Sequence, residues 1–249
     1  MRWISRLLRL LLVPLGAASI AHAGEVKVAV AANFAEPARE IAAKFQARSG
    51  HTAALTLGSS GQIATQIVNG APFEVFLSAD RERPQALERQ RLAVPASRFT
   101  YAIGRLVLFS RTPGLVDAKG EALARGRFER LAIADPKTAP YGAAAVAVLA
   151  KLGLKGRLQP KIVTGASIAQ TFQFVDTGAA ELGFVALSQV KSVVGGSRWL
   201  VPSRLHPPIA QQAVLLTAGA GNPAARAFLS YLKQPEARAI IRRYGYEAP

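Results

Sequence analysis

Short apolar runs typical of buried strands alternate with amphipathic, helix-like segments along most of the chain. In the first part the strand-like runs are Val26–Ala32, Thr52–Leu57 and Glu74–Ser78, each followed by a helical pattern. After the first run, apolar residues recur at helical spacing at Phe34, Ala38, Ile41, Ala42 and Phe45. This order predicts an α/β fold with a mostly parallel sheet flanked by helices.

A second series of the same kind begins near residue 105. Its strand-like runs are Arg105–Ser110, Leu131–Ala134, Lys161–Val163 and Leu182–Ala186, with helical patterns over about 141–152 and 167–176. A further strand-like run, Ile209–Thr217, precedes two final helical patterns, Ala224–Lys233 and Pro235–Arg243. We therefore expect two α/β lobes, the first from 24–102 with 217–249 and the second from 103–216. The two crossings between them would form a hinge.

The first 23 residues have the pattern of a secretory signal. Three arginines precede the apolar run Leu10–Ile20, and Ala21-His22-Ala23 matches a cleavage site, so the mature chain should begin at Gly24. No later segment is apolar enough to span a bilayer. The chain has no cysteine, which removes both a lipid-attachment thiol and a disulfide framework. These features predict a periplasmic protein that is not embedded in a membrane.

The chain is strongly basic. Its formal net charge is +16, and removing the signal with its three arginines leaves +13. The basic residues are scattered, the longest run is Arg242-Arg243, and aromatic residues do not alternate with them as in a base-stacking surface. We therefore expect no nucleic-acid partner, and interpret the charge as compositional bias that also attracts small anions.

The candidate chemistry lies at turns where a strand-like run passes into a helical pattern. In the first lobe these turns are Ala31-Ala32-Asn33-Phe34 and Gly58-Ser59-Ser60-Gly61, and in the second they are 135–142 and 164–170. Helix starts carry unpaired N–H groups, which bind anions. The two first-lobe motifs contain no Lys or Arg, so hydrogen bonds and dipoles would hold the ligand in place of ion pairs.

Donors without matching acceptors favour an oxyanion whose oxygens are all unprotonated. Catalysis has little support, because His51 and His206 have no partner at a recognisable spacing and Gln62 breaks the G-x-S-x-G pattern of a nucleophile elbow. The sequence also lacks a Walker A motif and a metal-ligand cluster. A binding protein is therefore expected. The alternatives are the same fold binding another oxyanion such as sulfate, or an exported hydrolase or sensor module.

The chain resembles the periplasmic molybdate-binding proteins of ABC-type importers, a type 2 solute-binding protein family. The resemblance covers nearly the whole mature chain and is carried by Val28–Phe34, Gly58–Gly61, Gly70–Asp80, Ala134-Asp135-Pro136, Leu182–Val185 and the ending 231–246. It implies a two-lobed, monomeric protein that closes over one molybdate or tungstate and delivers it to an inner-membrane permease. It implies no cofactor, and no metal other than that of the oxyanion.

By motif position, the resemblance implies ligand contacts at Asn33, Ser60, Tyr141 and Ile168, the last through its backbone N–H. Further candidates are Ala32, Ser59, Gly61, Ser167 and Ala186. The sequence departs from a common form of the pattern, with Asn33 where Ser is frequent, Tyr141 where a small residue is frequent, and Ala186 where a Tyr often supplies a hydroxyl. We hypothesise that the Tyr141 hydroxyl replaces the one missing at position 186, and the preference among oxyanions stays open.

Overall fold

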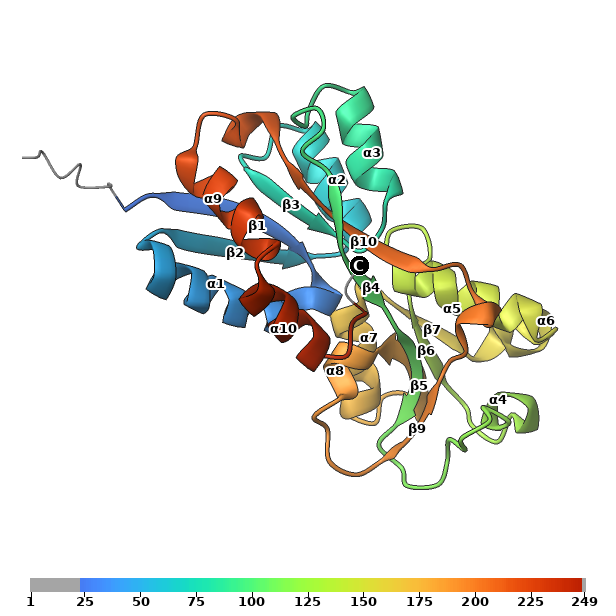
Figure 1. The fold of residues 1–249 in the computed structure, drawn as a ribbon. Helices are drawn as coiled ribbons and strands as arrows, with labels where there is room; N and C mark the ends of the chain where they lie inside the picture. Colours follow the sequence, from blue (N-terminus) through green and yellow to red (C-terminus); the bar gives the residue numbers. More distant parts are fainter. Residues whose placement is uncertain (1–22, 248–249) are drawn as a thin grey trace, which may run out of the picture.

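Two five-stranded sheets form the framework of the described residues, 23–247, in this computed structural model (Figure 1). The predicted signal, apart from Ala23, lies outside these residues. The first sheet has the order β2-β1-β3-β10-β4. Strands β1 and β2 are parallel, as are β1 and β3, whereas β10 is antiparallel to both β3 and β4. The strands are β1 (Glu25–Ala31), β2 (Thr52–Gly58), β3 (Val75–Ser78), β4 (Phe99–Gly104) and β10 (Ile209–Leu215).

The second sheet repeats this arrangement, with the order β7-β6-β8-β5-β9. Strand β6 is parallel to β7 and β8, and β5 is antiparallel to β8 and β9. The strands are β5 (Leu106–Ser110), β6 (Leu131–Ala134), β7 (Ile162–Gly165), β8 (Leu182–Ala186) and β9 (Ser197–Leu200). The predicted two-lobed α/β fold is confirmed.

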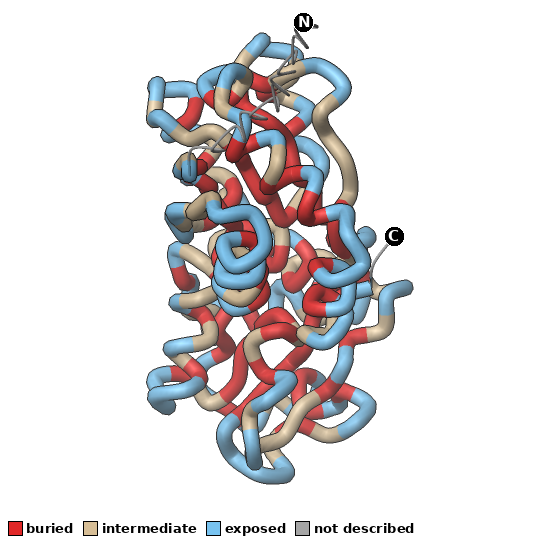
Figure 2. The backbone as a smooth tube through the Cα atoms, turned by 60° about the vertical axis from the view of Figure 1, so that its left-hand side comes forward, coloured by how far each residue is buried: buried red, intermediate tan, exposed pale blue. Residues whose placement is uncertain are grey.

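Helices cover both faces of each sheet, so the central strands are buried on both sides (Figure 2). On the first sheet, α1, α9 and α10 pack on one face and α2 and α3 on the other. On the second sheet, α5 packs on one face and α7 and α8 on the other. The helices are α1 (Ala35–Ser49), α2 (Ser60–Val68), α3 (Glu82–Arg89), α4 (Ala122–Arg125), α5 (Pro140–Lys151), α6 (Lys155–Leu158), α7 (Ile168–Asp176), α8 (Leu187–Val190), α9 (Pro223–Leu232) and α10 (Pro235–Arg243). A short 3-10 helix, η1 (Ala32–Phe34), follows β1.

Two connections join the sheets. Arg105 alone separates β4 from β5, and residues 201–208 connect β9 to β10. From the sequence we expected the chain to return to the first lobe near residue 217, which would leave Ile209–Leu215 in the second lobe. This expectation is wrong, because these residues form β10, which pairs with β3 and β4 of the first sheet. Within residues 23–247, no helix combines the length and apolar character that a membrane span requires.

Candidate functional site

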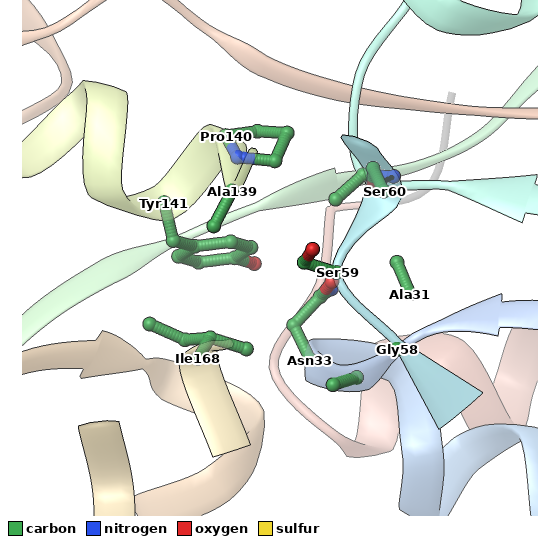
Figure 3. Close-up of a pocket in the computed structure, with 11 residues that line it drawn as sticks. Ala31, Asn33, Gly58, Ser59, Ser60, Ala139, Pro140, Tyr141 and Ile168 are labelled. Carbon is green, nitrogen blue, oxygen red and sulfur yellow. Dashed lines mark hydrogen bonds between the residues drawn. The ribbon is translucent and has the colours of Figure 1, made fainter. Parts of the chain in front are cut away.

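A small cavity lies between the two lobes, beyond the carboxyl ends of strands from both sheets (Figure 3). The turns after β1 and β2 line it on one side, and the starts of α5 and α7 line it on the other. It is narrow, with about 10 Å³ open to the centre of a water-sized sphere, and is lined by Ala31, Ala32, Asn33, Gly58, Ser59, Ser60, Ala79, Ala139, Pro140, Tyr141 and Ile168. Ligands of open α/β sheets bind at such positions.

Two serines at the start of α2 supply hydroxyl groups from the first lobe. Ser59 is the N-cap, and its Oγ accepts a hydrogen bond from the N–H of Gln62 at 3.4 Å. The Oγ of Ser60 accepts one from the N–H of Ala79 at 2.9 Å. Among the described residues, neither serine has an acceptor for its own hydroxyl proton. Both serines can therefore donate into the cavity.

Tyr141, in the first turn of α5, extends its ring across the cavity toward Asn33 and Ser59 (Figure 3). Its side chain is buried, and its hydroxyl oxygen accepts a hydrogen bond from Nε2 of Gln211 at 3.2 Å. Gly104 makes room for it, because a Cβ at that position would lie 2.2 Å from the hydroxyl oxygen. In the described part of the chain the hydroxyl donates no hydrogen bond of ordinary geometry, so a ligand can take up its proton in competition with the neighbouring phenol of Tyr246.

The cavity offers hydrogen-bond donors and no ionic group. None of its eleven lining residues is charged. Besides the three hydroxyls, three backbone N–H groups of lining residues at the helix starts have no hydrogen-bond partner among the described residues, those of Ser60 in α2, Tyr141 in α5 and Ile168 in α7. This donor set matches an anion whose oxygens all accept hydrogen bonds. A protonated oxygen would need an acceptor in the lining.

Burial keeps the tyrosines around the cavity protonated. It raises the pKa of Tyr141 well above the usual value of 10, with a further increase from the nearby phenols of Tyr246 and Tyr101. Burial also raises the pKa of Tyr246 to about 12 and that of Tyr101 well above 10. Tyr141 therefore remains a donor throughout the neutral pH range.

We expect anion affinity to stay constant between about pH 6 and 9, because no lining group titrates there. Stability should change only at higher pH. The folded-state pKa values of these phenols lie above the unfolded value of about 10. Their contribution to the free energy of unfolding is therefore complete below pH 10 and is lost as the pH rises toward about 12, the pKa of Tyr246. Calorimetric titration and thermal unfolding across this range test both statements. A marked loss of affinity between pH 7 and 9 would contradict them.

The structure brings most of the predicted site residues together. Asn33, Ser60, Tyr141 and Ile168 line the cavity, as do Ala32 and Ser59. The side chain of Asn33, however, is engaged within the protein, since its Nδ2 donates to Oε1 of Gln211 at 2.9 Å and to the hydroxyl of Tyr246 at 3.0 Å. Both amide protons are used in this way. In this structure the donor that Asn33 can offer to the cavity is its backbone N–H.

Three further candidates lie outside the lining. The N–H of Gly61 donates to the carbonyl of Thr138 at 2.8 Å. Ser167 is the N-cap of α7 and accepts from the N–H of Gln170 at 3.3 Å. Ala186 is fully buried, and its N–H donates to Oε1 of Gln189 at 2.9 Å. Each of these residues therefore has a structural role here, and ligand contact at these three positions stays a prediction.

Sequence reasoning missed the polar cluster behind the cavity. It comprises four buried residues, Tyr101, Ser188, Gln211 and Tyr246. The last three are joined to Asn33 or Tyr141 by hydrogen bonds, and Tyr101 is joined to Gln211. The carbonyl of Asn33 accepts from the hydroxyl of Tyr246 at 2.6 Å and from that of Ser188 at 2.8 Å. The one visible signal was the pair Gln211-Gln212 inside an otherwise apolar strand.

The two lobes also contact each other beside the cavity. Besides the bond from Gly61 to Thr138, Arg83 extends from α3 and donates through Nη2 to the carbonyl of Lys137 at 2.9 Å. An ion pair with Asp80 holds Arg83 in place. These contacts connect the start of α2 and α3 to the turn before α5.

Comparison with known proteins agrees with this architecture. The family of bacterial extracellular solute-binding proteins matches residues 26–247. The molybdate-binding protein ModA of Rhodobacter capsulatus is 56% identical over 232 residues, which are 93% of this chain and 92% of the relative. ModA of Azotobacter vinelandii is 55% identical over 242 residues, 95% of this chain and 96% of the relative. This chain belongs to the bacterial extracellular solute-binding proteins, and among them to the ModA family.

A solved ModA-family structure shares the fold. The periplasmic molybdate-binding protein of Azotobacter vinelandii has a TM-score of 0.87 and 44% sequence identity, and the match covers 90% of this chain and 99% of that one. The ModA proteins of Rhodobacter capsulatus and Azotobacter vinelandii are both named as molybdate-binding proteins. The family resemblance seen in the sequence is confirmed.

Proposed function

We propose that this protein captures molybdate in the periplasm and delivers it to an ABC permease in the inner membrane, and that it also binds tungstate. The observation that carries the proposal is the uncharged, donor-lined cavity between the lobes. Its hydroxyl and N–H groups suit a tetrahedral dianion without protons on its oxygens. The names of the ModA relatives support molybdate as that anion.

Capture takes place by closure of the lobes about the two connecting segments. Following the sheet pairing, we assign 24–104 and 209–247 to the first lobe and 105–208 to the second. Ser59 and Ser60 contribute from the first lobe, and Tyr141 and Ile168 from the second. An anion that binds both sets shifts the population toward the closed form. We expect the protein to act as a monomer.

Export follows cleavage of residues 1–23. The N–H of Gly24 donates to Nδ1 of His51 at 2.9 Å, and the carbonyl of Gly24 accepts from the N–H of Thr52 at 2.9 Å. Regular pairing thus begins directly after the proposed cleavage site, so removal of the preceding residues leaves β1 complete. This arrangement supports Gly24 as the mature N-terminus.

The proposal predicts which anions stabilise the purified mature protein. Molybdate and tungstate should each raise the melting temperature, by about 5 to 10 °C at one hundred times Kd. Phosphate at the same concentration should not, because no carboxylate lines the cavity to accept from its protonated oxygen. Thermal unfolding with each anion, with sulfate as a further test of selectivity, decides the matter. Equal stabilisation by phosphate would contradict the proposed selection.

An exported hydrolase or sensor module is not favoured. The relatives that match over nearly the full chain are named as molybdate-binding proteins. Selection of another oxyanion, such as sulfate, would require the same donor set with different cavity dimensions. The melting experiment separates that alternative from the proposed function.

A further inference from the structure

Gln211 lies behind the cavity and connects two of the proposed ligand-binding residues. It is fully buried in β10, and it is not among the residues that line the cavity. Its Oε1 accepts hydrogen bonds from Nδ2 of Asn33 at 2.9 Å and from the hydroxyl of Tyr101 at 3.0 Å. Its Nε2 donates to the hydroxyl of Tyr141 at 3.2 Å. One amide therefore contacts residues of both lobes.

A β-bulge helps to bring Tyr101 to this amide. Along β10, Gln211 pairs with Ala102 and the next residue, Gln212, pairs with Thr100, so Tyr101 is the extra residue on β4. Bulges turn side chains toward functional sites. The bulge lies on the two strands that lead to and from the second lobe, next to the crossings.

The neighbours of Gln211 fix the orientation of its amide. With its oxygen and nitrogen exchanged, its NH2 group would face the NH2 group of Asn33, which already donates to Tyr246. In the observed orientation Nε2 donates to Tyr141, and a phenol oxygen that accepts in this way keeps its own proton for another partner. In the described part of the protein this hydroxyl donates no hydrogen bond of ordinary geometry, although the phenol of Tyr246 lies near enough to compete for its proton, and the ring points into the cavity (Figure 3).

We infer that Gln211 is a positioning residue that makes the Tyr141 hydroxyl a donor to the bound anion. The inference rests on the proposed function. Gln211 thereby contributes to selection of unprotonated oxyanions, since reversal of its amide would direct the Tyr141 proton away from the cavity. It acts through Tyr141 and does not touch the anion.

A double-mutant cycle tests this role. Gln211→Glu keeps the shape of the side chain and the oxygen that accepts from Asn33 and Tyr101. It replaces the NH2 group that donates to Tyr141 by a carboxylate oxygen, which accepts a hydrogen bond from the Tyr141 hydroxyl. Affinities are measured by calorimetry at about pH 8.5, where a carboxylate held by three donors is ionised. In the wild type, Tyr141→Phe should cost about 10- to 150-fold. In the Gln211→Glu protein it should cost less than about 3-fold, because the hydroxyl no longer donates to the anion.

Gln212→Glu is the matched control. Gln212 is the next residue of the same strand, but its Oε1 accepts from Nη1 of Arg98 at 2.8 Å and its Nε2 donates to Thr100 at 3.3 Å. This variant adds the same charge without reaching Tyr141, so it should keep the full cost of Tyr141→Phe. Gln211→Met, neutral and of similar length, replaces Gln211→Glu if the latter does not fold. It should lower the cost of Tyr141→Phe below the wild-type value, because Tyr141 then lacks the donor that orients its hydroxyl.

An equal cost of Tyr141→Phe in the wild-type and Gln211 backgrounds overturns the inference, since it shows that Gln211 does not direct the hydroxyl. The wild-type titration separates this outcome from failure of the proposed function. A wild-type protein that binds another oxyanion and not molybdate would refute the proposed function. The same cycle with that anion would still decide the role of Gln211.

Discussion

Replacing Tyr141 by phenylalanine should weaken molybdate binding about 10- to 150-fold while leaving the fold intact. A hydrogen bond to a charged partner contributes about 1.5–3 kcal/mol, which corresponds to this range of affinity. The hydroxyl is the one polar group of the ring. It points into the cavity, and the hydrogen bond that it accepts from Gln211 leaves its proton available. Isothermal titration calorimetry of the purified, ligand-stripped variant measures the loss.

Tyr231→Phe provides the matched control. Tyr231 is also buried, and its hydroxyl has no hydrogen-bond partner in the described structure, but it lies on α9 away from the cavity. Removing this hydroxyl should leave molybdate affinity unchanged. Near-wild-type affinity of Tyr141→Phe would remove the Tyr141 hydroxyl from the proposed ligand contacts and would leave Ser60 and the backbone donors.

Most of the fold could be predicted from periodicity alone. The apolar run Leu182–Ala186 is β8, and the helical pattern expected over about 141–152 is α5, which begins at Pro140. These segments are long or uniformly buried, so local pattern and burial agree. Strands β4 and β9 were missed, because β4 mixes polar and apolar residues and β9 is short and partly exposed.

The sheet assignment of β10 shows what a local pattern cannot supply. Its sequence is that of a buried strand in either lobe. Only its antiparallel pairing with β3 and β4, more than one hundred residues earlier in the chain, places it in the first sheet. Pairing over such a distance depends on the shape of both edges and not on the strand's own residues.

The candidate site likewise has features that the local sequence predicts and features that depend on residues far away in the chain. The turns that hold Asn33, Ser60, Tyr141 and Ile168 could be found because strand-to-helix openings have a sequence pattern, and these residues do line one cavity. The use of the Asn33 side chain could not be foreseen. It depends on Gln211 and Tyr246, which are 178 and 213 residues away in sequence.

Gly61 was expected to contact the ligand, but the structure gives it a place in the contact between lobes. Its N–H bonds to the carbonyl of Thr138, and a Cβ on Gly61 would lie 2.8 Å from the Cα of Thr138 and 3.0 Å from that carbonyl oxygen. Both are backbone atoms that cannot rotate away. The lobes can approach to this distance only because residue 61 has no side chain.

Gly61→Ala should therefore weaken molybdate binding although it removes no donor from the cavity. Separating the lobes at this point costs about 1–3 kcal/mol in overpacking, or about 5- to 150-fold in affinity, and the anion should dissociate faster. Folding should not suffer, because Gly61 lies within α2, where alanine is the better helix former. Gly156→Ala, in α6 with open space around its Cβ, is the control and should bind normally. Calorimetry gives the affinities and stopped-flow measurement the dissociation rates. Unchanged affinity and dissociation in Gly61→Ala would show that the contact at Thr138 does not form part of the ligand-bound state.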